Sequence, residues 1–240
     1  MLYGIFAKDI MKYKNIVKGR FISRQNRFIA KCEIDGREET VHVKNTGRLK
    51  ELLICGCNAY FEKSGNPNRK TAYDLIAIEN VQSDLIQMVN IDSQIANAVA
   101  EEWLRKSVLF SESAVVRREV KYGGSRFDLY IEDGDRKAFM EVKGVTLRNG
   151  DTAMFPDAPT QRGVKHIKEL ITAVKSGYEA YILFVIQMKG VNRFTPNAAT
   201  HKDFATALTN AKNEGVNILA VDCMVTKDAI EADKLIDVIL

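Results

Sequence analysis

The sequence changes character close to Asn90, and this change restricts the possible folds more than any other feature. Residues 16–88 consist of short stretches of alternating apolar and polar character separated by turn residues. The alternation is plain in residues 27–33, and the pair Asp35-Gly36 is a strong signal for a hairpin turn. This part of the chain is therefore predicted to form an antiparallel β-structure.

The number and order of these stretches favour one kind of small barrel. Five strand segments are visible, and a short segment with a helical pattern, GRLKELLICG (47–56), lies between the third and the fourth. Five strands with one helix after the third is the plan of the OB fold, a Greek-key barrel that often binds oligonucleotides. Another small barrel, such as an SH3-like one, would show the same periodicity.

Helices and strands alternate in the second part of the chain. An amphipathic helix at 93–106 is followed by three strand segments, and a helix at 163–177 precedes a buried strand and a last helix and strand. This order indicates a mixed sheet covered by helices. We therefore expect an α/β (α+β) protein with two domains, a barrel in residues 1–90 and a mixed-sheet domain in residues 91–240.

Charge is distributed unevenly between these two parts. Residues 1–90 carry a net charge of +5 and residues 91–240 a net charge of −1. A locally basic domain favours a polyphosphate partner through the release of counterions. The sequence shows no signal peptide, no apolar run close to the about 20 residues of a membrane helix, and no repeated cysteine spacing. We expect a cytoplasmic protein that does not bind membranes.

One strand segment carries charges where apolar residues are expected. KAFMEVKGVTL (137–147) places Glu141 and Lys143 in an apolar run, and residues two apart on a strand share one face. The preceding strand segment contributes Asp128, and a turn at 133–135 links it to Glu141. In an antiparallel pair the two carboxylates would converge on one oxygen-rich site.

Such a site suits Mg²⁺ (or Mn²⁺), which takes one or two carboxylates, keeps several waters and coordinates phosphate oxygens. Lys143 would orient or deprotonate a metal-bound water that attacks a phosphodiester. The alternative is an ion pair of Lys143 with Asp128 or Glu141 at the sheet edge, because a short D…ExK pattern also arises by chance.

At this point the sequence resembles the sugar fermentation stimulation protein (SfsA) family, and the resemblance covers nearly the whole chain. The motifs that carry it are Asn45-Thr46-Gly47-Arg48, Ser64-Gly65-Asn66-Pro67-Asn68-Arg69-Lys70, Glu119-Val120-Lys121-Tyr122-Gly123, Ser125-Arg126-Phe127-Asp128, Glu141-Val142-Lys143, and Phe155-Pro156-Asp157-Ala158 with Thr160, Arg162, Gly163, Lys165 and His166. The resemblance implies an N-terminal OB domain, a restriction-endonuclease-like C-terminal domain of the PD-(D/E)XK type, and DNA binding linked to the control of sugar metabolism.

Carried over residue by residue, the resemblance makes Asp128, Glu141 and Lys143 the catalytic residues. It implies a Mg²⁺ site formed by Asp128, Glu141, the backbone carbonyl of Val142 and an additional acidic residue, Glu102, on the helix that leads into the domain.

The sequence departs from the family pattern at three places. Phe127 replaces the proline of the PD pair, Val43-Lys44 replaces the usual Cys-Pro, and Ala96 stands where a proline is usual. The first change leaves the carboxylate in place. The second removes a thiol, so no cysteine chemistry is expected there, and the third leaves the start of the helix open.

Nucleic-acid contacts are expected from cationic and amide side chains in both domains. The candidates in the barrel are Arg20, Arg24, Arg27, Asn45, Arg48, Lys63, Arg69 and Lys70; those in the second domain are Arg126, Arg162, Lys165 and His166. The aromatic residues beside them on the barrel strands are expected to be mainly core residues, because alternating strands need apolar inward positions.

Three functions fit these features. The first is a DNA-binding protein with a Mg²⁺-dependent phosphodiesterase (nuclease-like) site. The second is a non-catalytic DNA-binding regulator of sugar (maltose) metabolism, and the third is an RNA-binding or RNA-processing module, since OB folds accept both nucleic acids. No helix-turn-helix pattern is visible, so little sequence specificity is expected.

Overall fold

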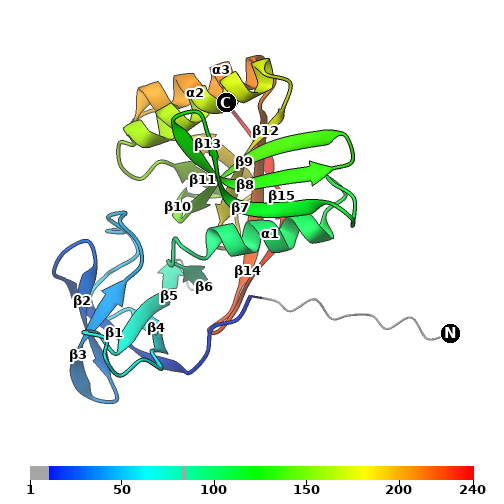
Figure 1. Ribbon diagram of the computed structural model, residues 1–240. Coiled ribbons are helices and arrows are strands. Elements are labelled where there is room, and N and C mark those ends of the chain that lie inside the picture. Colours follow the sequence, from blue (N-terminus) through cyan, green and yellow to red (C-terminus); the bar gives the residue numbers. More distant parts are fainter. Residues whose placement is uncertain (1–10, 83–84) are drawn as a thin grey trace.

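The computed structural model describes residues 11–82 and 85–240, which form two parts that follow each other along the chain (Figure 1). The first part is built from strands alone within its described residues, and the second combines strands with helices. We describe each part in turn and then the loops that bring them together.

The first part is a closed barrel of five strands, which confirms the OB-like prediction. Its strands are β1 (Ile16–Arg24), β2 (Ile29–Ile34), β3 (Arg37–Val43), β4 (Asn58–Lys63) and β5 (Tyr73–Gln82). Neighbouring strands pair antiparallel, and a short parallel pairing of β3 with β5 closes the barrel. β6 (Leu85–Asn90) pairs with β5 and leads to the second part. The alternating apolar positions, such as Val41, Phe61 and Leu75, are fully buried in the barrel.

The helix predicted at 47–56 is wrong. The segment consists of consecutive turns, in which the N–H groups of Leu52 and Leu53 both donate to the carbonyl of Leu49. Leu49 has φ 50°, in the left-handed region that a right-handed helix cannot contain. Leu49 and Leu52 are nevertheless buried, so the apolar spacing that imitates a helix fills the barrel core from a turn.

The second part contains a six-stranded mixed sheet, as predicted. Its strands, in spatial order, are β15 (Ile230–Leu235), β14 (Asn217–Val225), β12 (Glu179–Ile186), β9 (Arg136–Val145), β8 (Ser125–Asp133) and β7 (Val115–Tyr122). β9, β12 and β14 are parallel at the centre, and the outer strands are antiparallel. β9 therefore lies inside the sheet, between β8 and β12.

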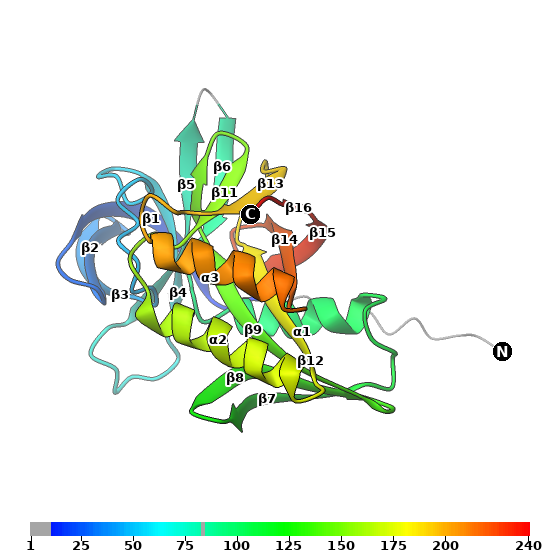
Figure 2. The ribbon, with the colours of Figure 1, turned by 90° about the horizontal axis from the view of Figure 1, so that it is seen from above.

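Helices cover both faces of this sheet. α1 (Ala96–Lys106) packs on one face, and α2 (Gln161–Lys175) and α3 (Lys202–Asn213) lie side by side on the other (Figure 2). Successive β9 residues serve the two faces, because Met140 packs with the α1 cluster and Phe139 with the α2 and α3 cluster. None of the helices in residues 11–82 and 85–240 is long and apolar enough to cross a membrane.

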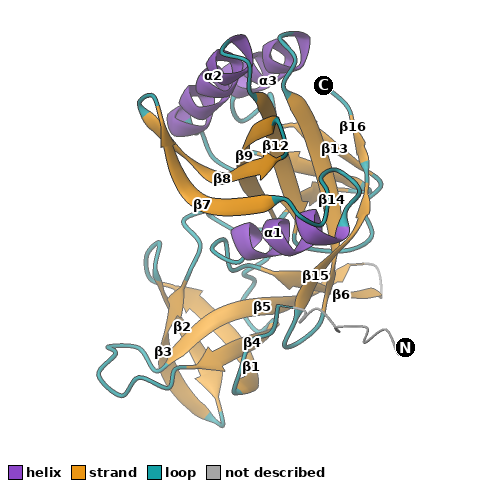
Figure 3. Cartoon of the chain, turned by 45° about the vertical axis from the view of Figure 1, so that its right-hand side comes forward, coloured by secondary structure: helices purple, strands orange, loops and turns teal. Residues whose placement is uncertain are grey.

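A small second sheet was not expected from the sequence. It consists of β10 (Leu147–Asn149), β11 (Thr152–Phe155), β13 (Arg193–Pro196) and β16 (Asp237–Val238). β10 follows directly on β9, so this sheet continues from the end of the central strand. Figure 3 labels two of its strands, β13 and β16, and β16 lies beside β14 of the six-stranded sheet. The loop after β11, residues 156–160, is thereby placed against the barrel loop 45–48, where Arg48 N–H donates to Asp157.

Candidate metal and nucleic-acid site

Glu141 is the most buried charge of the predicted site. Its side chain projects from β9 toward α2 and the residue is only 3% exposed. Oε1 is bonded to His166 Nδ1 and forms an ion pair with Lys143 Nζ. Oε2 is also buried, and it has no hydrogen-bond partner among the described residues. Oε1 of this carboxylate thus has two partners, whereas Oε2 remains free to bind a ligand.

His166 lies beneath this carboxylate and does not face solvent as a phosphate contact would. It belongs to α2, is 5% exposed, and has its Nε2 3.3 Å from Arg162 Nε. Because Arg162 can only donate, Nε2 must accept, and Nδ1 then carries the proton that is donated to Glu141. The prediction of His166 as a nucleic-acid contact is therefore replaced by a role in holding Glu141.

Asp128 sits beside Glu141 where β8 and β9 stop pairing. The last paired residues are Leu129 and Met140, so the next N–H on the β8 side of β9, that of Val142, is free to donate to Asp128 Oδ2 at 2.8 Å. The other oxygen, Oδ1, accepts from Asn97 Nδ2 of α1 at 2.9 Å. The Asp128 carboxylate thus accepts the Val142 N–H in place of a backbone carbonyl of β8.

The two carboxylates have opposite electrostatic surroundings. Burial, together with the negative charge of Glu141, raises the pKa of Asp128. Burial would also raise the pKa of Glu141, but Lys143 and His166 outweigh it and hold that pKa below its ordinary value. Adding a cation would relieve the repulsion that raises the pKa of Asp128.

The residues fit a hard divalent cation with few protein ligands. Among the described residues, no three His, Cys, Asp or Glu side chains are gathered as a complete metal cage. Mg²⁺ does not require one, because it commonly binds one or two carboxylates and completes its shell with waters and phosphate oxygens. The buried, unpartnered Oε2 of Glu141 and the adjacent Asp128 supply such a pair. The ligand role of the Val142 carbonyl stays a prediction.

Glu102 does not join this site. It lies on α1, where it accepts a hydrogen bond from the Met11 backbone and pairs with Lys106. The α1 residue that reaches Asp128 is Asn97, about one and a half turns earlier on the helix. The prediction that Glu102 is a metal ligand is therefore corrected, because Lys106 holds its carboxylate away from the site.

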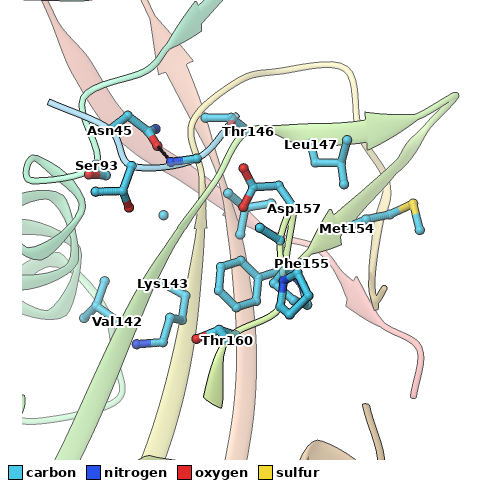
Figure 4. A pocket seen from close by; sticks show the side chains of 17 residues that line it. Asn45, Ser93, Val142, Lys143, Thr146, Leu147, Met154, Phe155, Asp157 and Thr160 are labelled. Atoms are coloured by element: carbon cyan, nitrogen blue, oxygen red, sulfur yellow. Dashed lines mark hydrogen bonds between the residues drawn. The ribbon is translucent and has the colours of Figure 1, made fainter. Parts of the chain in front are cut away.

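A cleft opens beside Lys143, between the barrel and the mixed sheet. Its volume is about 340 Å³, and β9 residues from Val142 onward form one wall while the barrel loop 45–47 and the loop 155–160 form the others (Figure 4). Asp157, Thr146 and Ser93 are among the polar side chains that line it. The cleft therefore joins the predicted catalytic strand to the predicted nucleic-acid domain.

A second, basic hollow of about 690 Å³ continues from the cleft across the barrel surface. The two share residues 46–47 and 158–159 as lining. Arg27, Arg48 and Lys50 line the second hollow and are exposed. Two of these three were expected contacts. Lys50 was not among them, although it stands two residues after Arg48 in the same run of turns.

Arg24 also lines this hollow but is not available to a ligand. Its five N–H groups donate to the backbone carbonyls of Asn26, Arg27, Asn45, Gly47 and Arg48. Asn45 is likewise engaged, because its amide donates to Ile91 O and accepts from Gly47 N–H. Both predicted contacts thus shape the loop 45–48.

The remaining predicted contacts are scattered. Arg69 forms two hydrogen bonds to the buried Asp74, and Arg126 pairs with Glu119. Lys165 donates to Gly124 O and Arg162 is bonded to His166. Arg20, Lys63 and Lys70 are exposed on the barrel and do not line either hollow. Arg69 in particular is a structural ion pair and not an open phosphate contact.

Two regions of the chain match known protein families. Residues 22–88 match the SfsA N-terminal OB domain, and residues 94–229 match the sugar fermentation stimulation protein RE domain.

Similar full-length proteins are known from several organisms. A sugar fermentation stimulation protein homolog of Clostridium beijerinckii is 54% identical over 230 residues, covering 96% of this chain and 100% of that protein. A homolog of Ruminiclostridium cellulolyticum is 54% identical over 228 residues, covering 95% and 99%. A solved structure of Pyrococcus furiosus SfsA in complex with Ca²⁺ is 31% identical, has a TM-score of 0.86, and covers 98% of this chain and 100% of that one.

Proposed function

The chain belongs to the sugar fermentation stimulation protein family, and from this premise we propose that it binds DNA and hydrolyses phosphodiesters with Mg²⁺ at Asp128, Glu141 and Lys143. DNA is held by the barrel and the cleft, and the chemistry takes place on β9. We also propose that the protein acts in the cytoplasm.

One observation carries this proposal, namely the buried and unpartnered Oε2 of Glu141 next to Asp128. A buried carboxylate oxygen without a partner costs free energy, and proteins rarely retain one without a compensating ligand. A divalent cation between the two carboxylates would remove that cost. The Pyrococcus furiosus relative was solved in complex with Ca²⁺, and Ca²⁺ and Mg²⁺ are both hard cations that prefer oxygen ligands.

Each residue of the site has a distinct task in this proposal. Asp128 and Oε2 of Glu141 would hold the cation, while His166 keeps Oε1 of Glu141 occupied and the carboxylate fixed. When bound, Mg²⁺ would lower the pKa of a coordinated water and offset negative charge on the phosphate. The side chain of Lys143 is 20% exposed beside the cleft, and its ammonium would bind a phosphate oxygen or orient the attacking water.

The surface around the site supports a nucleic-acid substrate. The basic hollow leads directly into the cleft beside Lys143, and its cations are exposed. Contacts of this kind are made to phosphates and carry little sequence information. We therefore propose DNA binding with little sequence specificity.

A second function is favoured by a different observation. Glu141 already has two partners, the ammonium of Lys143 and the imidazole of His166. Its negative charge is therefore balanced within the protein even if the site catalyses no reaction. In that case the protein is a non-catalytic DNA-binding regulator, and the cleft and the basic hollow still hold DNA.

One experiment separates the two functions. Labelled single-stranded and double-stranded DNA are incubated with the protein in Mg²⁺, in Mn²⁺ and in EDTA. We expect cation-dependent cleavage by the wild type and a rate at least about 10²-fold lower for Asp128→Asn. Glu132→Gln, four residues along the same strand, is the matched control and should cut at the wild-type rate. Binding without cleavage of any substrate would establish the regulator instead.

A further inference from the structure

We infer that the cleft between the barrel and the sheet holds one unpaired nucleotide of a DNA strand, whose phosphates then run along the basic hollow over Arg27, Arg48 and Lys50. The inference rests on the proposed function and specifies its substrate as single-stranded or locally unpaired DNA. It assigns the base to the cleft and the backbone to the hollow.

The size of the cleft points to a single nucleotide. Its volume of about 340 Å³ is at the small end of the range of about 300–1,000 Å³ typical of ligand pockets. This space accommodates one base with its sugar and excludes a base pair. Enzymes that act on a nucleotide in a confined pocket take it out of the stack, and an unpaired strand avoids the cost of doing so.

The side chains of the cleft suit a base better than a phosphate. Asp157 lies in the cleft, where its Oδ2 accepts from Arg48 N–H. A carboxylate there repels phosphate but accepts hydrogen bonds from the amino group of a base. Thr146 and Ser93 add hydroxyl groups, and Phe155 adds an apolar surface that suits the face of a base (Figure 4).

The hollow outside the cleft suits the phosphates. Arg27, Arg48 and Lys50 are exposed there, and none of them has a side-chain ion pair with a described residue. The loop that carries Arg48 is fixed from below by Arg24. A preformed cationic track next to a base pocket is the arrangement by which proteins hold single strands with little sequence preference.

The cleft cannot widen easily to admit a duplex, because its walls are bonded to one another. Ser93 N–H and Oγ both donate to Lys44 O, and Asn45 Nδ2 donates to Ile91 O. Arg48 N–H reaches across to Asp157 of the opposite wall. These bonds tie the barrel loop to the start of the second part and to the loop after β11.

The test measures binding, so that it does not depend on cleavage. Fluorescence anisotropy compares a labelled single strand with the matching duplex, in Ca²⁺. We expect the single strand to bind the wild type at least about tenfold more tightly. Ser93→Phe places a ring in the cleft from an exposed position and should weaken single-strand binding about tenfold. Ser113→Phe adds the same ring at an exposed position that lines neither the cleft nor the basic hollow, and it should leave binding within about twofold.

A second pair of variants tests whether the basic hollow binds the phosphates. Arg48→Ala with Lys50→Ala should reduce the slope of log affinity against log salt for single-strand binding by about 1.4, as expected for two lost phosphate contacts at about 0.7 each. Arg37→Ala with Lys212→Ala removes the same charge from exposed positions outside the hollow and should leave the slope unchanged.

The outcomes distinguish this inference from the proposed function. Equal affinity for single strand and duplex, or undiminished binding by Ser93→Phe, overturns the inference even if the wild type cuts DNA in an Asp128-dependent manner. Tight single-strand binding that Ser93→Phe weakens about tenfold supports it even if no substrate is cut, in which case only the catalytic part of the proposed function fails.

Discussion

Arg24 and Arg48 show how differently two arginines in the same basic hollow are used. Arg24 has all five N–H groups bonded to backbone carbonyls, and burial lowers the pKa of its guanidinium. Arg48 lies at the edge of the same hollow with its side chain exposed. A positively charged residue that lines a binding surface is therefore not always a ligand contact. Arg24 instead holds the backbone of the loop that presents Arg48.

We predict that Arg24→Ala destabilises the protein by about 3 kcal/mol, because five backbone carbonyls lose a charged donor at once. Arg24→Lys should restore only part of this, since an ammonium cannot reproduce the planar fork of donors. Urea denaturation measures the free energy of unfolding. Arg20→Ala, at an exposed position on the same strand, is the control and should change it by less than about 0.5 kcal/mol.

The candidate site was predictable from the sequence only where local geometry decides it. Glu141 and Lys143 share a face because a strand repeats every two residues, and the turn after β8 brings Asp128 alongside. Which side chain of α1 faces Asp128 depends on how the helix is rotated against the sheet. The family resemblance implied Glu102, and the packing brings Asn97 to Asp128 instead.

At the scale of elements, Glu79 joins three strands of the barrel on the outside. It projects from β5 and accepts hydrogen bonds from Lys18 of β1 and from Asn58 and Tyr60 of β4. Burial opposes its charge, but Tyr60, Lys18 and Asn58 outweigh burial and lower the pKa of Glu79 to about 2. The charged carboxylate is thus part of the barrel's stability.

This predicts a specific loss of stability in acid. A carboxyl group whose pKa is lower in the folded state stabilises the fold above its unfolded pKa of about 4.5 and loses that contribution as the pH falls toward about 2. The free energy of unfolding of Glu79→Gln should therefore lie below that of the wild type at pH 7, and the difference should shrink between pH 4.5 and pH 2. Chemical denaturation at each pH measures it.

The control for this prediction is Glu112→Gln, since Glu112 is exposed and has no hydrogen bond or ion pair with a described residue. Its curve should follow that of the wild type over the whole range. A constant difference between Glu79→Gln and the wild type from neutral to acid pH would mean that the charge of Glu79 contributes nothing.

Strands and helices were predictable to the extent that their signals are local. The barrel strands and the three helices follow from periodicities of two and of 3.6 residues. The turns at 47–56 imitate a helix because buried leucines at similar spacing fill the barrel core. The small sheet is built from strands of two to four residues that lie far apart in sequence, so no single segment of it has a recognisable pattern.

At the scale of the whole molecule, Lys44 links the barrel to the second part. Its ammonium lies 3.3 Å from Asp74 and 3.2 Å from Asp92. Lys44 stands at one of the positions where the sequence departs from the family pattern, and the structure gives that departure a role at the junction. The hydrophobic core is also shared, since one cluster contains Phe61 of the barrel and Phe184 of the sheet.

We therefore predict that the two parts unfold together. Trp103 is the single tryptophan of the chain and lies on α1, so its fluorescence reports on the second part, whereas far-UV circular dichroism reports on both. The two denaturation curves should coincide. Phe61→Ala leaves a cavity in the barrel core and should lower the free energy of unfolding by about 3–5 kcal/mol. It should shift the Trp103 fluorescence curve as far as the dichroism curve.

Val108→Ala is the control, because Val108 is fully exposed and its truncation should shift neither curve. A Phe61→Ala protein whose dichroism changes at lower denaturant than its Trp103 fluorescence would show that the barrel unfolds independently.

The contact between Gly47 and Asp157 has a consequence for how this protein can evolve. A side chain at position 47 would bring its Cβ to 2.3 Å from Asp157 Oδ2, and these two residues belong to loops contributed by different parts of the chain. A side chain at position 47 would therefore have to displace the Asp157 carboxylate, which accepts the Arg48 N–H. A gene half taken from another protein would fit this one only if it kept a glycine at position 47 or left room for a side chain there at position 157, so recombination between the halves is constrained by a single glycine.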